Sequence, residues 1–280
     1  MKKYFTITLL VVALTLPVLC TAQENGSNIK IKTTKPYKAR SAHKGWKLVW
    51  ADEFNGKEVD PSSWERCPRN GADWGRHMSY LDTLCQVKNG VLELHGICTP
   101  EGVNENIPYL TGGVQSRNRR SIRNGRVDVR ARFDCGQGFW PAIWLMPDIN
   151  IPWPHGGEID IMEHLSYEDI AYQTVHSNHT LKQNQPTSKT SETTHINKAE
   201  FNIYSVEVNE DEITFYINDK HTFTYKRMEP TPAGQYPFAD HPFYVILSAQ
   251  LGGSWVGKVE PKDLPVKMEI DFVRFYEKRK

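Results

Sequence analysis

Short alternations of apolar and polar residues recur along the chain after Gly45. Hydrophobic side chains occupy every second position in each of them, which is the spacing of a β-strand with one buried face. Gly, Pro, Asn and Asp separate these runs, and no stretch of a dozen residues keeps a helical 3.6-residue period. The pattern predicts an all-β fold, an antiparallel β-sandwich. The clearest runs cover residues 46–50, 91–94, 127–133, 213–217, 243–249 and 268–276.

The N-terminal residues have the layout of a secretory signal peptide. Lys2 and Lys3 precede an apolar run at residues 5–19, and the small residues that follow place the cleavage after Ala22. Because the run is short for a membrane span, we expect an exported chain, in the periplasm or outside the cell, with no membrane span. Lipidation at Cys20 is the alternative interpretation.

Residues 23–43 form a polar, lysine-rich stretch without periodicity. Such a composition buries too little apolar surface to fold by itself. We therefore expect a signal peptide at residues 1–22, a flexible leader at 23–43 and a single β-domain at 44–280.

Composition narrows the choice of partner. Lys and Arg total 34 and Asp and Glu total 33, so the formal net charge is only +1. This balance gives no electrostatic reason to expect a nucleic acid or an anionic membrane. Aromatic residues are numerous, with 8 Trp, 12 Tyr and 11 Phe. They suit either a sandwich core or a groove that stacks flat ligands.

The cysteines beyond the predicted signal peptide show no Cys-x-x-Cys spacing, so a zinc knuckle is not supported. In an oxidising compartment they could form up to two disulfides. The sequence leaves the pairing state of these residues open: Cys67, Cys85, Cys98 and Cys135.

Three carboxylates fall within residues 158–163, which read Glu-Ile-Asp-Ile-Met-Glu. In a regular strand, Glu158 and Asp160 point to one face. Glu163 would point to the opposite, buried face, where an unpaired carboxylate is costly. A β-bulge at one of the two residues before Glu163 returns it to the face of the other acids. We therefore predict a bulged strand with three acids along one face.

Crowded carboxylates cannot all ionise independently, because repulsion raises the pKa of at least one. A protonated acid beside an ionised one is what retaining glycoside hydrolysis needs. We assign Glu158 as the nucleophile, Glu163 as the general acid/base and Asp160 as the residue that hydrogen-bonds Glu158 and tunes its protonation. We expect no catalytic metal. A solvated acidic strand and a Ca²⁺ site are the alternatives for such a string.

The preceding apolar segment favours the carbohydrate interpretation. Trp140, Ala142 and Trp144 share one face of a predicted strand. Two indoles around a small residue form a floor on which a sugar ring can stack. An aromatic floor beside three acids therefore indicates chemistry on a glycan.

The acidic motif at 158–163 resembles the catalytic signature of glycoside hydrolase family 16 in its bulged form. The similarity covers about residues 46–278, and the supporting blocks follow the family's order. They lie at residues 50–56, 125–132, 201–218, 242–255 and 270–276. The resemblance implies a curved β-jelly roll with a glycan-binding cleft on its concave face, and an endo-acting, retaining enzyme without a catalytic cofactor. Its expected partner is an oligosaccharide or polysaccharide, and we expect a monomer.

The resemblance also implies roles for individual residues. Glu158, Asp160 and Glu163 match the family's catalytic acids, in agreement with the strand argument. Trp140 and Trp144 match its sugar-stacking positions. His176 matches a cleft histidine of the family, and a purely structural histidine is the alternative. Trp255 matches a rim aromatic of the closing block, and core packing is the alternative.

A structural calcium ion is the one metal that the resemblance allows. Some members of the family hold Ca²⁺ on the convex side. The corresponding positions in this chain are Glu53, Gly90 and Asp271.

The substrate is less well defined by the sequence. Residues 72–79 and the run around Gln250 depart from the pattern of the family's β-1,3(4)-glucanases. They look more like members from gut bacteria that cut β-1,4-galactosyl bonds in mucin-type O-glycans. Trp74 and Arg76, with His77, are then expected to shape the sugar pocket, and Gln250 to contact the substrate; an ordinary surface loop is the alternative.

Three other functions stay open at this point. A laminarinase-like endo-β-1,3(4)-glucanase and an algal galactan hydrolase of the agarase or porphyranase kind use the same acids. An anionic galactan would favour a basic cleft, which Arg117, Arg119 and Arg120 could supply locally. A non-catalytic glycan-binding lectin has no need for three aligned acids.

Overall fold

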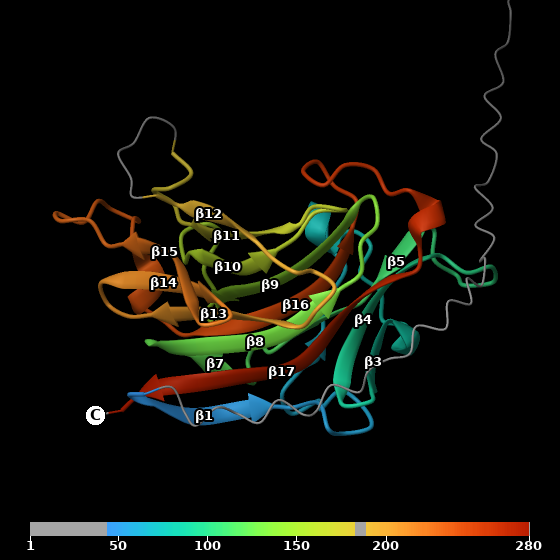
Figure 1. The fold of residues 1–280 in the computed structure, drawn as a ribbon. Coiled ribbons are helices and arrows are strands. Elements are labelled where there is room, and N and C mark those ends of the chain that lie inside the picture. The colour runs from blue at the N-terminus through green and yellow to red at the C-terminus, as the bar shows by residue number, and fades with distance from the viewer. Residues whose placement is uncertain (1–43, 183–188, 280) are drawn as a thin grey trace, which may run out of the picture. The chain divides into compact units, whose positions relative to one another are not determined.

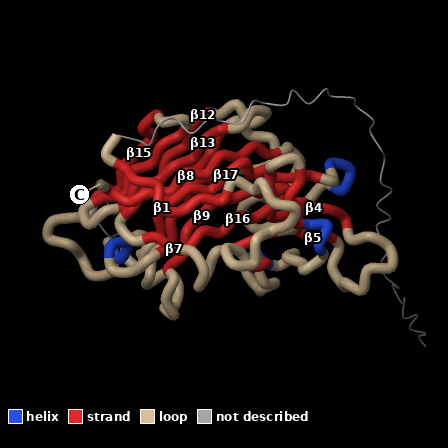
Figure 2. The backbone as a smooth tube through the Cα atoms, turned by 90° about the horizontal axis from the view of Figure 1, so that it is seen from below, coloured by secondary structure: helices blue, strands red, loops and turns tan. Residues whose placement is uncertain are grey.

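The computed structural model describes residues 44–182 and 189–279, so the predicted signal peptide and leader lie outside the described residues. Export and a monomeric state stay predictions of the sequence. Strands dominate the described chain, which confirms the all-β expectation (Figure 2). No helix within the described ranges has the length and apolar character needed to cross a membrane. Four short 3₁₀ turns complete the described elements: η1 (Asp73–Gly75), η2 (Asp82–Leu84), η3 (Pro237–Ala239) and η4 (Pro261–Asp263).

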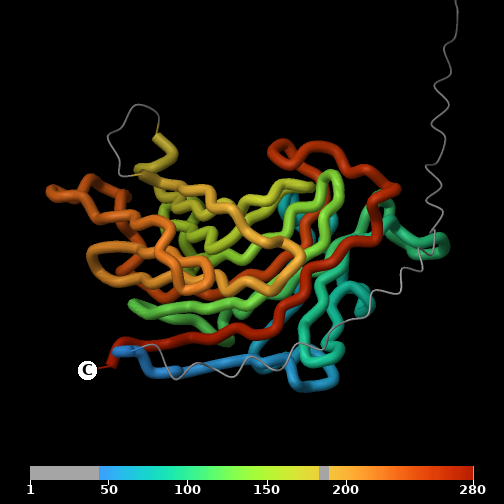
Figure 3. The backbone as a smooth tube through the Cα atoms, viewed as in Figure 1, coloured from blue at the N-terminus to red at the C-terminus, as the bar shows by residue number. Residues whose placement is uncertain are grey.

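The first sheet has nine strands in the described chain, and all their pairings are antiparallel. Its central order is β15-β14-β13-β8-β17-β4-β3, with β1 beside β17 and β5 beside β4. Figure 3 shows the blue β1 lying along the red β17, so the described ends of the chain are joined by one ladder. The strands are β1 (Trp46–Asp52), β3 (Cys85–Lys88), β4 (Val91–Cys98), β5 (Tyr109–Thr111), β8 (Gly125–Phe133), β13 (Asn202–Val208), β14 (Glu212–Ile217), β15 (Lys220–Lys226) and β17 (Val266–Lys278).

The second sheet has eight antiparallel strands among the described residues, in the order β12-β11-β10-β9-β16-β6-β2, with β7 beside β16. It stacks on the first sheet as the other layer of the sandwich (Figure 1). The strands are β2 (Glu65–Arg66), β6 (Gly113–Gln115), β7 (Ser121–Ile122), β9 (Phe139–Pro147), β10 (Glu158–Glu163), β11 (Ile170–His176), β12 (Ser191–His195) and β16 (Phe243–Leu251).

The main hydrophobic core lies between the two sheets and takes alternate side chains from each. Full burial of one such aliphatic or aromatic side chain stabilises the fold by about 1.5–3 kcal/mol. Both layers therefore depend on the period-two pattern of the sequence. Typical contributors are Val127, Val129 and Ala131 from β8, and Val245, Leu247 and Ala249 from β16.

A second, smaller apolar cluster lies on the other face of the second sheet. Trp144 and Ile246 belong to it, and Trp74 packs against it from the segment that follows β2. The strands β9 and β16 are therefore covered on both faces at this point. This cover shapes the surface beside the acids.

No disulfide joins two of the four cysteines that the sequence analysis considered. Cys67, Cys85 and Cys135 carry free thiols. Since three of the four candidates are free, no disulfide can form between two members of this set. Burial raises the pKa of the Cys67 and Cys85 thiols, so both are poor nucleophiles.

Candidate active site

Strand β10 lies between β9 and β11 and carries the predicted bulge. Asp160 pairs with Trp144 of β9, whereas Met162 pairs with the next residue of β9, Ile143. Ile161 is therefore the extra residue. The register against β11 shifts in the same interval. The bulge that the acidic spacing predicts is confirmed.

The bulge determines which face of the second sheet each side chain of β10 points to. Ile159, Ile161 and Met162 all enter the main core. The three acids take the opposite face of the second sheet: Glu158, Asp160 and Glu163. Without the extra residue, Glu163 would lie among the core aliphatics.

Each of the acids has a nitrogen partner from a neighbouring element. The Trp153 indole donates a hydrogen bond to Glu158 Oε2 at 2.6 Å. Trp140 donates from its indole to Glu163 Oε1 at 3.0 Å. His176 Nε2 of β11 lies 3.3 Å from Asp160 Oδ2.

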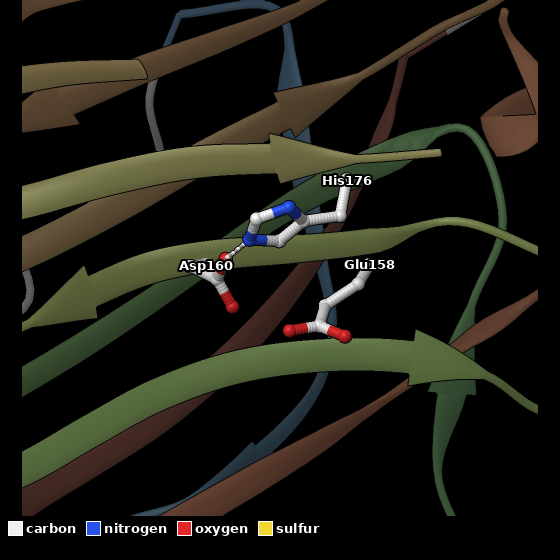
Figure 4. Close-up of side chains that lie close together, drawn as sticks. All are labelled: Glu158, Asp160 and His176. Carbon is white, nitrogen blue, oxygen red and sulfur yellow. Dashed lines mark ion pairs between the residues drawn. The ribbon is translucent and has the colours of Figure 1, made fainter. Parts of the chain in front are cut away.

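Figure 4 shows Asp160 and His176 facing each other from adjacent strands, with the Glu158 carboxylate beside them. His176, predicted as a cleft residue, thus belongs to the acid cluster itself. Trp153 is a site residue that the sequence analysis missed. Its only sequence signal is an indole five residues before the first acid.

Burial raises the pKa of all three carboxyls. For Glu158, repulsion from Asp160 adds to desolvation, while His176 and the Trp153 hydrogen bond oppose the rise. For Asp160 desolvation is the leading cause. Glu163 has its pKa raised well above the usual range by desolvation first and then by the charge of Asp160. The cluster therefore favours shared protons over three separate negative charges.

Of the two indoles predicted to form a sugar-stacking floor, only one is accessible at the surface. Trp140 is partly exposed beside the acids, whereas Trp144 is 6% exposed. Trp74 packs edge-on against the Trp144 ring, with centroids 4.9 Å apart, and the Trp144 indole donates to Ser248 Oγ. Since Trp74 retains partial exposure, it takes the surface position above Trp144. The sequence placed both indoles on the correct face, but only packing shows that one is covered.

Trp255, which the resemblance matches to a rim aromatic, lies at the protein surface. Its side chain is 46% exposed, and its ring meets Trp140 and Tyr172 edge-on at 5.4 and 5.1 Å. Gln250 lies opposite Trp140 in the β9–β16 ladder. Its side chain is buried, and its Oε1 has no hydrogen-bond donor among the described residues.

The predicted specificity segment is tied to the segment that carries Trp255. Asp73 accepts hydrogen bonds from the backbone N–H and the hydroxyl of Ser254 and pairs with Arg76. The neighbouring His77 Nδ1 lies 2.7 Å from the Leu251 carbonyl oxygen. Residues 73–77 are thus held against the turn after β16.

Two surface hollows flank this turn, and neither includes an acid of β10 in its lining. The larger, of about 480 Å³, extends from Trp255 towards the residues after β10. The smaller, of about 390 Å³, is lined by Arg76, His77, Tyr109 and Lys258, together with glycines of the turn. Predicted site residues therefore border both hollows.

The predicted calcium and arginine positions lie elsewhere. Glu53 makes a bidentate pair with Arg274 at 2.7 and 2.8 Å. The Asp271 carboxylate pairs with Arg130 at 2.5 Å. Arg119 is neutralised by Glu65, which leaves it less available to an anionic substrate. Whether the chain binds calcium stays a prediction.

Comparison with known proteins agrees with this site. The sequence model of Glycosyl hydrolases family 16 matches residues 80–274. The chain is 34% identical over 237 residues to the keratan-sulfate endo-1,4-beta-galactosidase of Sphingobacterium multivorum, which covers 82% of this chain and 55% of that protein. The chain thus spans about half the length of that relative.

Solved structures share the fold. The laminarinase from Rhodothermus marinus superposes with a TM-score of 0.75 at 30% identity, over 86% of this chain and all of that one (100%). A structure from work on endo-acting O-glycanases by which human gut microbiota initiate mucin breakdown gives a TM-score of 0.72 at 29% identity. It covers 83% of this chain and 100% of that one. The sandwich, the bulged acidic strand and these matches show that the chain belongs to family 16 of the glycosyl hydrolases and is an O-glycosyl hydrolase.

Proposed function

We propose that the chain cleaves internal β-linkages of a galactose-containing host glycan, as an endo-β-1,4-galactosidase on mucin-type O-glycans. The observation that carries the catalytic part is the bulge at Ile161, which puts three acids on one face. Double displacement with retention requires two carboxyl groups close together in opposite protonation states. That mechanism is characteristic of the family.

Glu158 acts as the nucleophile in this proposal. His176 and the Trp153 N–H both favour its anion, and the anion is the form that attacks the anomeric carbon. Glu163, with its pKa raised well above the usual range, holds the proton for the leaving oxygen. It then removes a proton from the water that releases the glycosyl-enzyme. Asp160 lies between them and keeps Glu163 protonated through its charge.

The substrate preference rests on two supports. The keratan-sulfate relative is an endo-1,4-beta-galactosidase by name, and a similar structure comes from work on mucin O-glycanases. The segment 73–77 that departs from the glucanase pattern also packs onto Trp144 and onto the turn after β16. A polar pocket at this place can reject an epimeric hydroxyl strongly.

An endo-β-1,3(4)-glucanase is the second candidate. The laminarinase structure is as similar in sequence as the O-glycanase structure, at 30% against 29% identity. The acids do not discriminate between the two, because both reactions use the same double displacement.

Product analysis separates the candidates. The full chain is incubated with mucin O-glycans, poly-N-acetyllactosamine, laminarin, mixed-linkage glucan and agarose, with Glu158→Ala as the inactive control. We expect oligosaccharides ending in galactose from the first two substrates. Glucose oligomers from laminarin or mixed-linkage glucan would instead identify a glucanase. Binding without shortening of any glycan would identify a lectin.

A second experiment tests the division of labour between the acids. Glu163→Gln should lose activity on natural glycans and regain part of it on a substrate with an activated leaving group, because only proton donation is missing. Glu158→Ala should regain nothing. Equal loss on both substrates for Glu163→Gln would contradict its role as the acid.

A further inference from the structure

Glu158, Asp160 and His176 bring three metal-ligating side chains together across two neighbouring strands. One ligand atom of each lies within 4.8 Å of the other two. Glu158 and His176 are direct partners in the β10–β11 register, so the backbone ladder fixes their meeting. Figure 4 shows the two carboxylates and the imidazole converging on one small volume.

Asp160 presents to this volume a buried oxygen whose nearest nitrogen partner is the His176 imidazole. Its side chain is 3% exposed, and its Oδ2 receives no hydrogen bond from any described residue. Most buried side-chain polar atoms have such a partner. His176 Nε2 stands 3.3 Å from this oxygen. Ligands bound to Zn²⁺ at about 2.0–2.1 Å in a tetrahedron are separated by about 3.4 Å, so this edge of the site already has the right length.

We propose that Glu158, Asp160 and His176 bind a divalent transition-metal ion such as Zn²⁺, and that the bound ion inhibits the hydrolase. One imidazole nitrogen with two carboxylate oxygens suits Zn²⁺. Ca²⁺ prefers six to eight oxygen ligands and is disfavoured here. The ligand atoms lie within 4.8 Å of one another, so Glu158 has to shift towards the other two to reach separations of about 3.4 Å. Its hydrogen-bond partner Trp153 is 55% exposed, so this partner is not fixed by burial.

Inhibition follows from the position of the ion. A carboxylate that ligates Zn²⁺ has donated the electron pair that would attack the sugar, and the ion occupies space beside the anomeric carbon. This part of the inference rests on the proposed roles of Glu158 and Asp160. The binding itself does not depend on them.

Isothermal calorimetry with ZnCl₂ on the full chain tests the site. We expect a binding event that His176→Gln weakens at least tenfold, because an amide keeps the shape but is a poor zinc ligand. Asp160→Asn should weaken it likewise. The matched control is His195→Gln, which changes an exposed histidine on the neighbouring β12. CaCl₂ should give no comparable heat.

Several results would overturn the site. They are the absence of zinc binding, equal binding by the wild type and His176→Gln, or equal weakening by the His195→Gln control. Circular dichroism of each variant confirms that it is folded, and Asp160→Asn serves as the second variant if His176→Gln misfolds.

Hydrolysis assays test the inhibition. Zn²⁺ should slow the wild-type enzyme, excess EDTA should restore the rate, and the residual activity of His176→Gln should be less sensitive to the ion. Zinc that binds this site without slowing hydrolysis would overturn the inhibitory role. If the chain hydrolyses no glycan, the proposed function fails, and calorimetry still decides the metal site.

Discussion

Gln173 donates a hydrogen bond from its side-chain Nε2 to the backbone carbonyl of Ile161 at 3.0 Å. Ile161 is the extra residue of the bulge, and a bulge leaves one backbone position without its ladder partner. Gln173 is fully buried on β11, and its Oε1 accepts a hydrogen bond from Thr222 at 2.5 Å. A side chain thus replaces the missing strand partner and holds the bulge that places Glu163.

Gln173→Leu should destabilise the fold and reduce turnover together. It leaves the Ile161 carbonyl buried without a donor, which costs about 1–3 kcal/mol, and it loosens the position of Glu163. Denaturant unfolding and kcat on the best glycan measure the two effects. Thr222→Val, which removes only the outer hydrogen bond, should have the smaller effect. An equally stable and active Gln173→Leu would show that the bulge needs no such support.

Trp153→Phe should lower kcat about tenfold, because a hydrogen bond to a charged group contributes about 1.5–3 kcal/mol and this one orients the proposed nucleophile. KM should change less, since the ring is retained. Steady-state kinetics on a defined oligosaccharide separate the two constants. Trp46→Phe, on β1 of the first sheet, is the control. An unchanged kcat would limit Trp153 to a surface role.

Asp73→Ala should raise KM several-fold and leave kcat nearly unchanged. The substitution removes the hydrogen bonds to Ser254 and frees the turn that carries Trp255, whereas the acids on β10 are untouched. Substrate-dependence curves for wild type and variant measure this split. Asp82→Ala, which breaks an exposed ion pair with Arg66, is the matched control. A selective loss of kcat would mean that Asp73 acts on the acids and not on the turn.

His164 should make the fold sensitive to acid. Burial lowers the pKa of its imidazole from 6.5 to about 4, so the unfolded chain binds this proton more readily than the folded one. The stabilisation is complete above the unfolded pKa of about 6.5 and is lost as the pH falls towards 4. Its size is about 3 kcal/mol.

Unfolding free energies at several pH values measure this contribution. Between pH 7 and 4, His164→Gln should lose less stability than the wild type does. Parallel curves would contradict the role of His164. His221→Gln, on the exposed part of β15, should follow the wild type.

Much of the fold and the acidic motif could be predicted because both depend on local periodicity. Strands such as β8 and β16 follow the period-two pattern, since alternate side chains must enter the core. The acid spacing required a bulge before Glu163 for the same reason. The shared face of Trp140 and Trp144 followed from alternation alone.

Contacts between distant segments could not be predicted. Gln173 supports the bulge across the β10–β11 ladder, and Asp73 meets Ser254 from 181 positions away in the chain. The sequence predicts that Trp144 is open to a sugar ring, whereas in the structure Trp74 packs against its ring.

The sequence by itself thus determined which residues share a strand face, and with that the all-β fold and the line of acids. Only the tertiary structure decided which of these residues are open to a ligand and which groups hold them. The physical reason is that alternation is a property of one strand, whereas burial and hydrogen bonding depend on which other segment packs against it.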